Sequence, residues 1–156
     1  MRVLRSALGG FATGVTIVTC VDGAGHRVGL TANSFTALSL EPPLVLWSLR
    51  SASPSLNAFA SGAHFAINVL GEGQVALSRR FASPVADKFA EGVWHAGLGG
   101  VPVLNEAAAV FECELVSQQE AGDHVLFIGR VLHFADGSLA PLVFHGGRYH
   151  RLGPVL

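Results

Sequence analysis

The amino-acid sequence predicts a mainly β protein, a single β-barrel with a few short helices. Stretches rich in Val, Ile, Thr and Phe recur along the chain, about seven in all, and turns rich in Gly, Pro and Asp separate them. The chain lacks the alternation of strands with long amphipathic helices that builds a parallel α/β sheet. No repeat or linker divides the sequence, so residues 1–156 are expected to form one domain.

The N-terminal part of the chain is predicted to contain one short helix and three strands. Residues 2–9 carry apolar side chains at helical spacing and end at two glycines. Residues 15–21 are rich in Val, Ile and Thr, and a turn over 22–25 leads into a second strand that begins near Arg27. These two strands should form a hairpin, and residues 44–49 form the next strand.

The middle of the chain combines short helices with one strand. Ser53 and Pro54 resemble the N-cap and the first residue of a helix. Residues 64–70 are predicted as a strand because they are apolar and β-rich. A helix is predicted over residues 74–81, with a further helical turn over 85–90.

Two long strands are predicted near the C-terminus, over residues 108–119 and 123–135, before a short strand over 142–145. The first alternates apolar and polar side chains, as a half-buried strand does. The second is apolar on both faces, so both faces are expected to be buried. One face would line the barrel interior and the other would form a subunit contact.

The composition indicates a homo-oligomer, most simply a symmetric homodimer. Half of the residues are hydrophobic, 13% are charged, and the mean hydropathy is +0.47. No apolar run approaches the roughly 20 residues of a transmembrane helix, so we assign the excess apolar surface to a subunit interface rather than to a membrane. The net charge of −1, without a long basic run, argues against nucleic acid as a partner.

Several common kinds of site are not supported by the sequence. Cys20 and Cys113 lack CxxC spacing, and the seven histidines form no HxH or HxxxH pair, so no metal site is expected. The dinucleotide motif GxGxxG and the nucleophile elbow GxSxG are also missing. The first residues contain no apolar segment long enough for a signal peptide, so a cytoplasmic location is expected.

A polar stretch between apolar strands is the most unusual feature of the sequence. It opens the segment 29–49 with small side chains, those of Thr31, Ala32, Asn33 and Ser34. Polar groups in such a position need hydrogen-bond partners. They can bond to nearby backbone groups, or they can present donors and acceptors to a bound polar ligand. Both interpretations stay open at this point.

Other positions carry candidate binding chemistry, each with a structural alternative. Lys88 is the single lysine and can pair with Asp87 as a solvated charge. His124 is the first residue of an apolar strand, where its side chain either forms a hydrogen bond at the strand end or reaches into a pocket. Four polar residues cluster where a strand meets a helix and suit either helix capping or a phosphate. These are Ser48, Arg50, Ser51 and Ser55.

The chain resembles the short-chain flavin reductase family, whose members supply reduced flavin to a separate monooxygenase. Six segments carry the resemblance in the family's order. They are GFATGVTIVT (10–19), GLTANSFTALSLEPPLVLWSL (29–49), HFAINVL (64–70), RFASPVADKF (80–89), GDHVLFIGRV (122–131) and PLVFHGGRY (141–149).

This resemblance implies an FMN-binding split β-barrel of Greek-key type that acts as a homodimer, with flavin at the dimer interface. It places Thr31, Ala32, Asn33 and Ser34 against the isoalloxazine ring and ribityl chain. It places Ser48, Arg50, Ser51 and Ser55 near the phosphate. Lys88 and Phe89 would also lie near the flavin, His124 would lie near the nicotinamide, and Tyr149 would help to close the same pocket.

The function that the resemblance implies is reduction of free FMN, or of FAD, by NADH or NADPH. Hydride would pass from nicotinamide C4 to flavin N5, and the protein would supply alignment and electrostatics. His124 is the catalytic candidate, as a positioning or electrostatic group rather than a proton shuttle. Reduced flavin would pass to a flavin-dependent monooxygenase. The alternative is a related protein that retains its flavin, as a flavin store or a ferric reductase.

Overall fold

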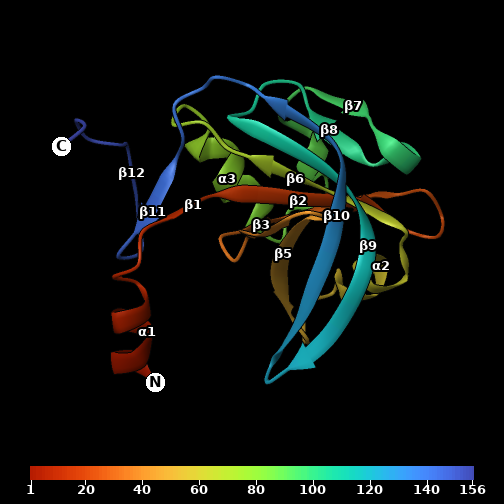
Figure 1. Cartoon of the computed structure of the whole chain (residues 1–156), viewed down its shortest axis with the longest axis horizontal. Helices are drawn as coiled ribbons and strands as arrows, with labels where there is room; N and C mark the ends of the chain where they lie inside the picture. Colours follow the sequence, from red (N-terminus) through yellow and green to blue (C-terminus); the bar gives the residue numbers. More distant parts are fainter.

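The structure, a computed structural model that describes residues 1–156, confirms the mainly β class. Seven strands make the main sheet: β2 (Thr16–Val21), β3 (Arg27–Ala32), β4 (Thr36–Leu40), β5 (Pro43–Arg50), β6 (His64–Val69), β9 (Ala109–Ala121) and β10 (His124–Asp136). They are antiparallel, in the order β3-β2-β6-β9-β10-β5-β4 (Figure 1). Five shorter strands form two small sheets: β1 (Thr13–Gly14), β11 (Val143–His145) and β12 (Arg148–His150), and the pair β7 (Trp94–Ala96) and β8 (Pro102–Leu104).

Three short helices and two 3-10 turns complete the chain: α1 (Arg2–Leu8), α2 (Leu56–Ser61), α3 (Val75–Phe81), η1 (Lys88–Ala90) and η2 (Leu98–Gly100). None of the helices is both long and apolar enough to cross a membrane. The predicted start of α2 is wrong, because Ser55 is its N-cap residue. The Ser53 hydroxyl instead accepts a hydrogen bond from the Ser55 N–H at 3.2 Å, which makes a local turn before the helix begins.

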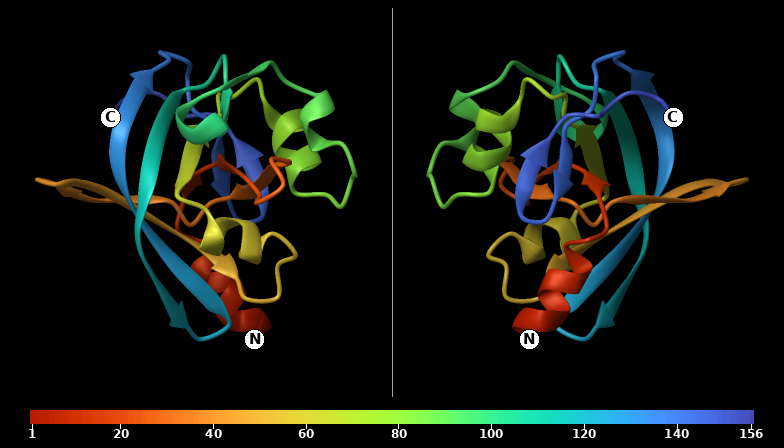
Figure 2. Two further views of the ribbon diagram at one scale, coloured as in Figure 1. Left: turned by 90° about the vertical axis from the view of Figure 1, so that its right-hand side faces the viewer. Right: turned by 90° about the vertical axis from the view of Figure 1, so that its left-hand side faces the viewer.

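The main sheet is strongly curled but open. Its edge strands, β3 and β4, follow each other in the sequence, yet they are not hydrogen-bonded to each other. Two register shifts between β9 and β10 bend the long strands, one of them at Gly129. A Cβ atom at Gly129 would lie 2.4 Å from the Phe65 ring, so glycine is what lets the curled strands approach. Figure 2 shows the β4–β5 hairpin projecting from the body.

Two hydrophobic cores pack against the two faces of this sheet. In the first, Trp47 contacts Phe59 and Phe127, with ring centroids 4.8 and 5.0 Å apart. Cys20 and Cys113 are free thiols within it, and burial raises the pKa of each to about 12.

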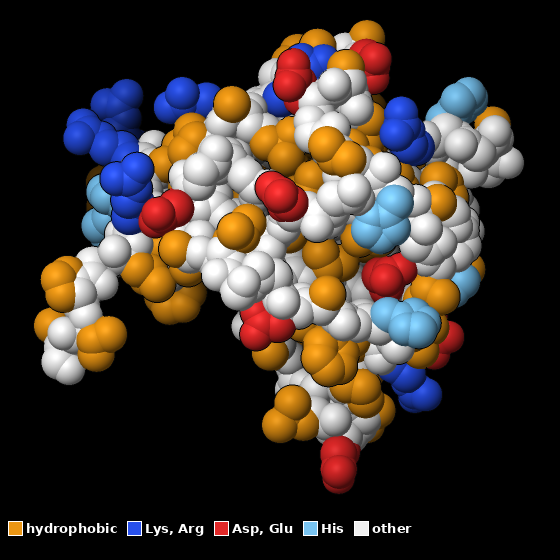
Figure 3. Space-filling model, turned by 90° about the horizontal axis from the view of Figure 1, so that it is seen from above, with side chains coloured by type: hydrophobic (Ala, Val, Ile, Leu, Met, Phe, Trp, Pro, Cys, Tyr) orange, Lys and Arg blue, Asp and Glu red, His pale blue; other side chains and the backbone are white.

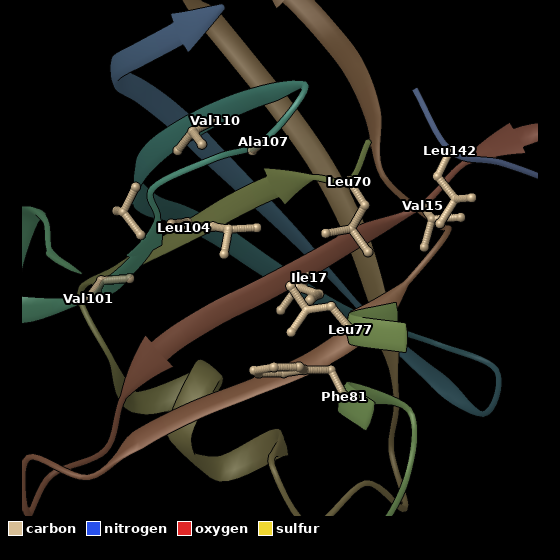
Figure 4. Packing of buried hydrophobic residues seen from close by; sticks show 12 residues of the cluster. Val15, Ile17, Leu70, Leu77, Phe81, Val101, Leu104, Ala107, Val110 and Leu142 are labelled. Atoms are coloured by element: carbon tan, nitrogen blue, oxygen red, sulfur yellow. The ribbon is translucent and has the colours of Figure 1, made fainter. Parts of the chain in front are cut away.

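The second core holds α3 against β3 and β2 (Figure 4). Phe81, the last residue of α3, is completely buried in it, beside Ile17 and Leu77. This packing fixes the segment that follows α3 next to the open edge of β3.

The end of β10 differs from the strict alternation that the sequence predicts. Val125 and Phe127 are buried as expected, and Leu126 and Ile128 on the other face are half-buried. A register shift between Val131 and His133 places Phe134 opposite Phe111, on the face of Val131, and there Leu132 and Phe134 are 42% and 75% exposed. The helix α1 is also exposed along its whole length.

Candidate functional site

A cavity of about 650 Å³ lies where the edge of β3, the end of β5 and the segment after α3 meet. Nine residues predicted from the sequence line it: Thr31, Ala32, Asn33, Ser34, Ser48, Arg50, Ser55, Lys88 and His124. We call it the main cavity. Its volume is within the range of about 300–1,000 Å³ typical of small-molecule sites.

In the polar stretch at the edge of β3, some side chains bond to the backbone of the chain and others are left for a ligand. The Thr31 hydroxyl donates to the carbonyl oxygen of Ser78 at 2.6 Å. The Ser34 hydroxyl donates to the carbonyl oxygen of Ser48 and accepts from its N–H, each at 3.0 Å. These two side chains therefore hold the wall of the cavity together. Asn33 is exposed and makes no side-chain hydrogen bond within the chain, so its amide is available to a ligand.

Lys88 is not paired with Asp87, contrary to the simplest sequence interpretation. Its ammonium group donates to the carbonyl oxygens of Gly29 at 3.1 Å and of Phe81 at 3.0 Å. Partial burial lowers the pKa of Lys88. An ammonium group has three donors, so one N–H remains for a ligand in the cavity.

Arg50 and His124 lie opposite each other where β5 pairs with β10. The His124 Nδ1 atom forms a hydrogen bond with the Asp123 carboxylate at 2.7 Å, which leaves the Nε2 atom for a ligand. This hydrogen bond, together with the charges of His124 and Arg50, lowers the pKa of Asp123. No carboxylate lines the main cavity, so Arg50 and Lys88 make it electropositive and suited to a phosphate.

Three residues predicted for the site lie outside the main cavity. Ser51 is exposed, and its N–H donates to the carbonyl oxygen of Asp123 at 2.9 Å, next to the turn that carries His124. Phe89 packs edge-on against Phe81 and lines a neighbouring cavity.

Tyr149, the third of these residues, lines a smaller cavity of about 210 Å³. Its hydroxyl shares a hydrogen bond of 2.7 Å with the Ser78 hydroxyl. This smaller cavity shares Thr31, Ala32 and Asn33 with the main one, so Tyr149 stands on the other side of the same strand edge.

Nine lining residues were not predicted: Leu30, Leu49, Ala52, Ser53, Pro54, Phe81, Ala82, Ser83 and Pro84. The last four run from the end of α3 into the segment that follows it. They fall within the segment 80–89 that resembles the flavin reductases, so that resemblance could have identified them as residues of the site. Their nearness to β3 depends on the docking of α3, which no local pattern encodes.

Comparison with known proteins gives a consistent result. Residues 8–153 match the family model described as "Flavin reductase like domain". The chain is 49% identical over 148 residues to the "Probable flavin reductase" of Rhizobium meliloti, covering 95% of this chain and 48% of that protein. It is 43% identical over 150 residues to the "FMN reductase (NADH) SmoA" of Agrobacterium fabrum, covering 96% of this chain and 85% of that protein.

A solved structure is similar as well. The NADH:FAD oxidoreductase SgcE6 of Streptomyces globisporus, in complex with NAD and FAD fragments, superposes with a TM-score of 0.91 at 38% identity, over 98% of this chain and 93% of that one. The chain spans 48% to 64% of the length of the first three curated relatives that it matches. The family match covers nearly all of the residues, and the chain belongs to the flavin reductase-like domain family.

Proposed function

We propose that this chain reduces free flavin with a reduced nicotinamide nucleotide, and that FMN, or FAD, binds in the main cavity. The single observation that carries the proposal is the composition of that cavity. Its lining contains the Asn33 amide, which has no hydrogen-bond partner in the chain, and two cations, Arg50 and Lys88. The same lining has no carboxylate.

The residues present fit a flavin nucleotide. The small side chains along the edge of β3 allow a flat ring to approach the strand, and Asn33 offers both a donor and an acceptor to the polar edge of such a ring. At the other end, Arg50 and Lys88 would hold the phosphate, with the Ser48 and Ser55 hydroxyls beside them.

The bound flavin supplies the redox chemistry, and the protein supplies binding and orientation. Thr31 and Ser34 keep the β3 edge in place through their hydrogen bonds to Ser78 and Ser48. His124, held by Asp123, positions the nicotinamide or stabilises charge near it. Alignment of this kind contributes on the order of 7–11 kcal/mol in well-oriented model reactions.

A homodimer with a split β-barrel in each subunit is part of the proposal. The C-terminal end of β10 leaves Leu132 and Phe134 uncovered. On the β4–β5 hairpin, Leu38 and Leu40 are 47% and 90% exposed, and the projection at the bottom of Figure 3 carries hydrophobic side chains. A second copy of the chain would cover such surfaces, since large exposed apolar patches mark association sites. The open edge between β3 and β4 would be the split of the barrel.

The recipient of reduced flavin is proposed to be a separate flavin-dependent monooxygenase. Two relatives carry such names: the reductase component of a "Flavin-dependent trigonelline monooxygenase" from Acinetobacter baylyi and the monooxygenase reductase subunit HsaB from Rhodococcus jostii. We place the protein in the cytoplasm, a compartment in which free thiols such as Cys20 and Cys113 persist.

An anaerobic assay tests this proposal. NADH mixed with FMN should lose the visible absorbance of oxidised flavin at a rate proportional to the protein concentration, with NADPH and FAD as the alternative substrates. The proposal fails if no combination of nicotinamide and flavin reacts faster than the mixture without protein. The coupled assay adds a monooxygenase encoded beside this gene, whose turnover should depend on the reductase.

A further inference from the structure

A second cavity of about 490 Å³ adjoins the main one. The two cavities share Ser55 and Lys88 in their walls. Lys88 therefore stands at the boundary, and two of its three N–H donors bond to the carbonyl oxygens of Gly29 and Phe81. The proposed function uses only the main cavity, so the second one needs its own explanation.

The second cavity combines a stacking cation with a carboxylate. The guanidinium group of Arg27 lies over the ring of Phe89, 5.0 Å from its centroid, and forms no ion pair. The ring of Phe89 is itself held by edge-on contacts with Phe81 and Trp94, each at 5.0 Å. Asp87 also lines the cavity, and its carboxylate has no hydrogen-bond partner in the chain.

These groups match the parts of an adenylate. A planar guanidinium group stacks on aromatic bases, and here its position is fixed by the aromatic ring beneath it. A carboxylate accepts hydrogen bonds from ribose hydroxyls, as in dinucleotide sites of other folds. The remaining donor of Lys88 can serve a phosphate that lies between the two cavities. His26, a further lining residue, is bonded to the Asp22 carboxylate at 3.1 Å and is left out of this assignment.

We propose that the second cavity binds the adenosine 5′-phosphate half of a dinucleotide whose diphosphate lies at Lys88. The inference rests on the proposed function, because it takes the main cavity to hold the flavin half. FAD and NADH both contain this adenylate. FAD fits with a single molecule, since its flavin and adenylate halves would occupy the two cavities on either side of Lys88.

The test compares ligands with and without the adenylate. FAD and FMN are titrated by flavin fluorescence, and NADH is compared with reduced nicotinamide mononucleotide by their KM values. The variant is Arg27→Ala, which removes the exposed stacking cation and leaves the main cavity intact. The matched control is Arg148→Ala, another exposed arginine that lines neither cavity and forms no ion pair.

Wild type is expected to bind FAD about tenfold more tightly than FMN, a difference of about 1.4 kcal/mol. Arg27→Ala should remove most of this difference and change the Kd of FMN by less than twofold. If Arg27→Ala instead raises the KM of NADH alone, the adenylate in the second cavity is that of the nicotinamide donor. The inference is overturned if FAD and FMN bind with equal Kd and Arg27→Ala changes neither the Kd of a flavin nor the KM of a nicotinamide.

Failure of the adenylate inference can be distinguished from failure of the proposed function. A protein that reduces FMN normally while Arg27→Ala has no effect keeps its function and loses the adenylate site. A protein that distinguishes FAD from FMN through Arg27, but reduces neither flavin with either nicotinamide nucleotide, keeps the site and loses the function.

Discussion

The hydroxyl of Ser34 forms two hydrogen bonds with the backbone of a single residue, Ser48. It donates to the Ser48 carbonyl oxygen and accepts from the Ser48 N–H, each at 3.0 Å. Ser34 lies between β3 and β4, and Ser48 lies within β5. The pair therefore ties the connection between the two sheet edges to a strand that lines the main cavity.

Replacement of Ser34 by alanine should destabilise the protein. A half-buried N–H group and carbonyl oxygen would lose their partner, which costs about 1–3 kcal/mol per unsatisfied group when water cannot replace it. Urea denaturation of Ser34→Ala should show a lower free energy of unfolding together with a raised flavin KM. Thr36→Ala, at an exposed position two residues along, is the control. Equal stability of the two variants would contradict the structural role of Ser34.

Replacement of Asn33 should act on flavin binding without affecting stability. Asn33 is exposed and has no hydrogen bond to lose within the chain. In Asn33→Leu the ligand loses a donor and an acceptor and meets a bulkier side chain, so the KM for flavin should rise about tenfold or more. The melting temperature should stay within about 2 °C of wild type, because surface substitutions usually change stability by less than about 0.5 kcal/mol. An unchanged flavin KM would remove Asn33 from the site.

The lowered pKa of Lys88 predicts an early alkaline limit for flavin binding. Burial disfavours the charged ammonium, so it loses its proton below the ordinary lysine value of about 10.4. Because the protonated form is the one that attracts a phosphate, kcat/KM for flavin should fall with rising pH below that value. Lys88→Arg should move this fall to higher pH, since arginine keeps its charge.

The same shift gives the sign of the stability change. Between the lowered pKa in the folded protein and the ordinary value in the unfolded chain, the unfolded chain binds more protons at this position. The contribution of Lys88 to the free energy of unfolding therefore increases as the pH rises through that interval. Lys88→Met should remove this increase. A pH profile of unfolding identical in wild type and Lys88→Met would contradict the assignment.

Gly29 is predicted to be intolerant of alanine. An added Cβ atom would lie 2.8 Å from the Phe81 ring and 3.0 Å from the Phe89 ring, and Phe81 is completely buried. Forcing a methyl group into such a packed position costs about 1–3 kcal/mol. Thermal unfolding of Gly29→Ala should show the loss. Gly23→Ala, where the added atom meets nothing within 4 Å, is the matched control and should be close to neutral.

The exposed end of β10 predicts the subunit contact. Phe134 is 75% exposed in the single chain, and Leu132, at the register shift just before it, is 42% exposed. Phe134→Asp should shift the protein from the proposed dimer to a monomer in light scattering after gel filtration, because an aspartate would be desolvated in the interface. The control is Val93→Asp, at a valine that is 66% exposed elsewhere. A Phe134→Asp protein that stays dimeric would place the contact on another surface.

Much of the fold followed from local patterns. Alternation of apolar and polar residues predicted the long strand β9, an apolar run on both faces predicted β10, and a Gly-rich turn predicted the hairpin of β2 and β3. The predicted start of α2 was wrong because the Ser53 hydroxyl can accept a hydrogen bond either as a helix N-cap or in a local turn, and here it forms the turn. The second face of β10 was predicted to form a subunit contact, and that stays a prediction. The alternation of β10 was predicted to run to its end, but a register shift between Val131 and His133 interrupts it, because a bulge depends on the partner strand.

What the sequence determined by itself was the β class and the segment that borders the main cavity, because periodicity and small polar side chains are local properties. What only the tertiary structure decided was the use of each polar group. Thr31 bonds to a carbonyl oxygen 47 residues away, and Lys88 bonds to one 59 residues away. Such partners depend on strand register and on the docking of α3. A sequence pattern encodes which groups need hydrogen bonds, and the packed structure determines which of them are left for a ligand.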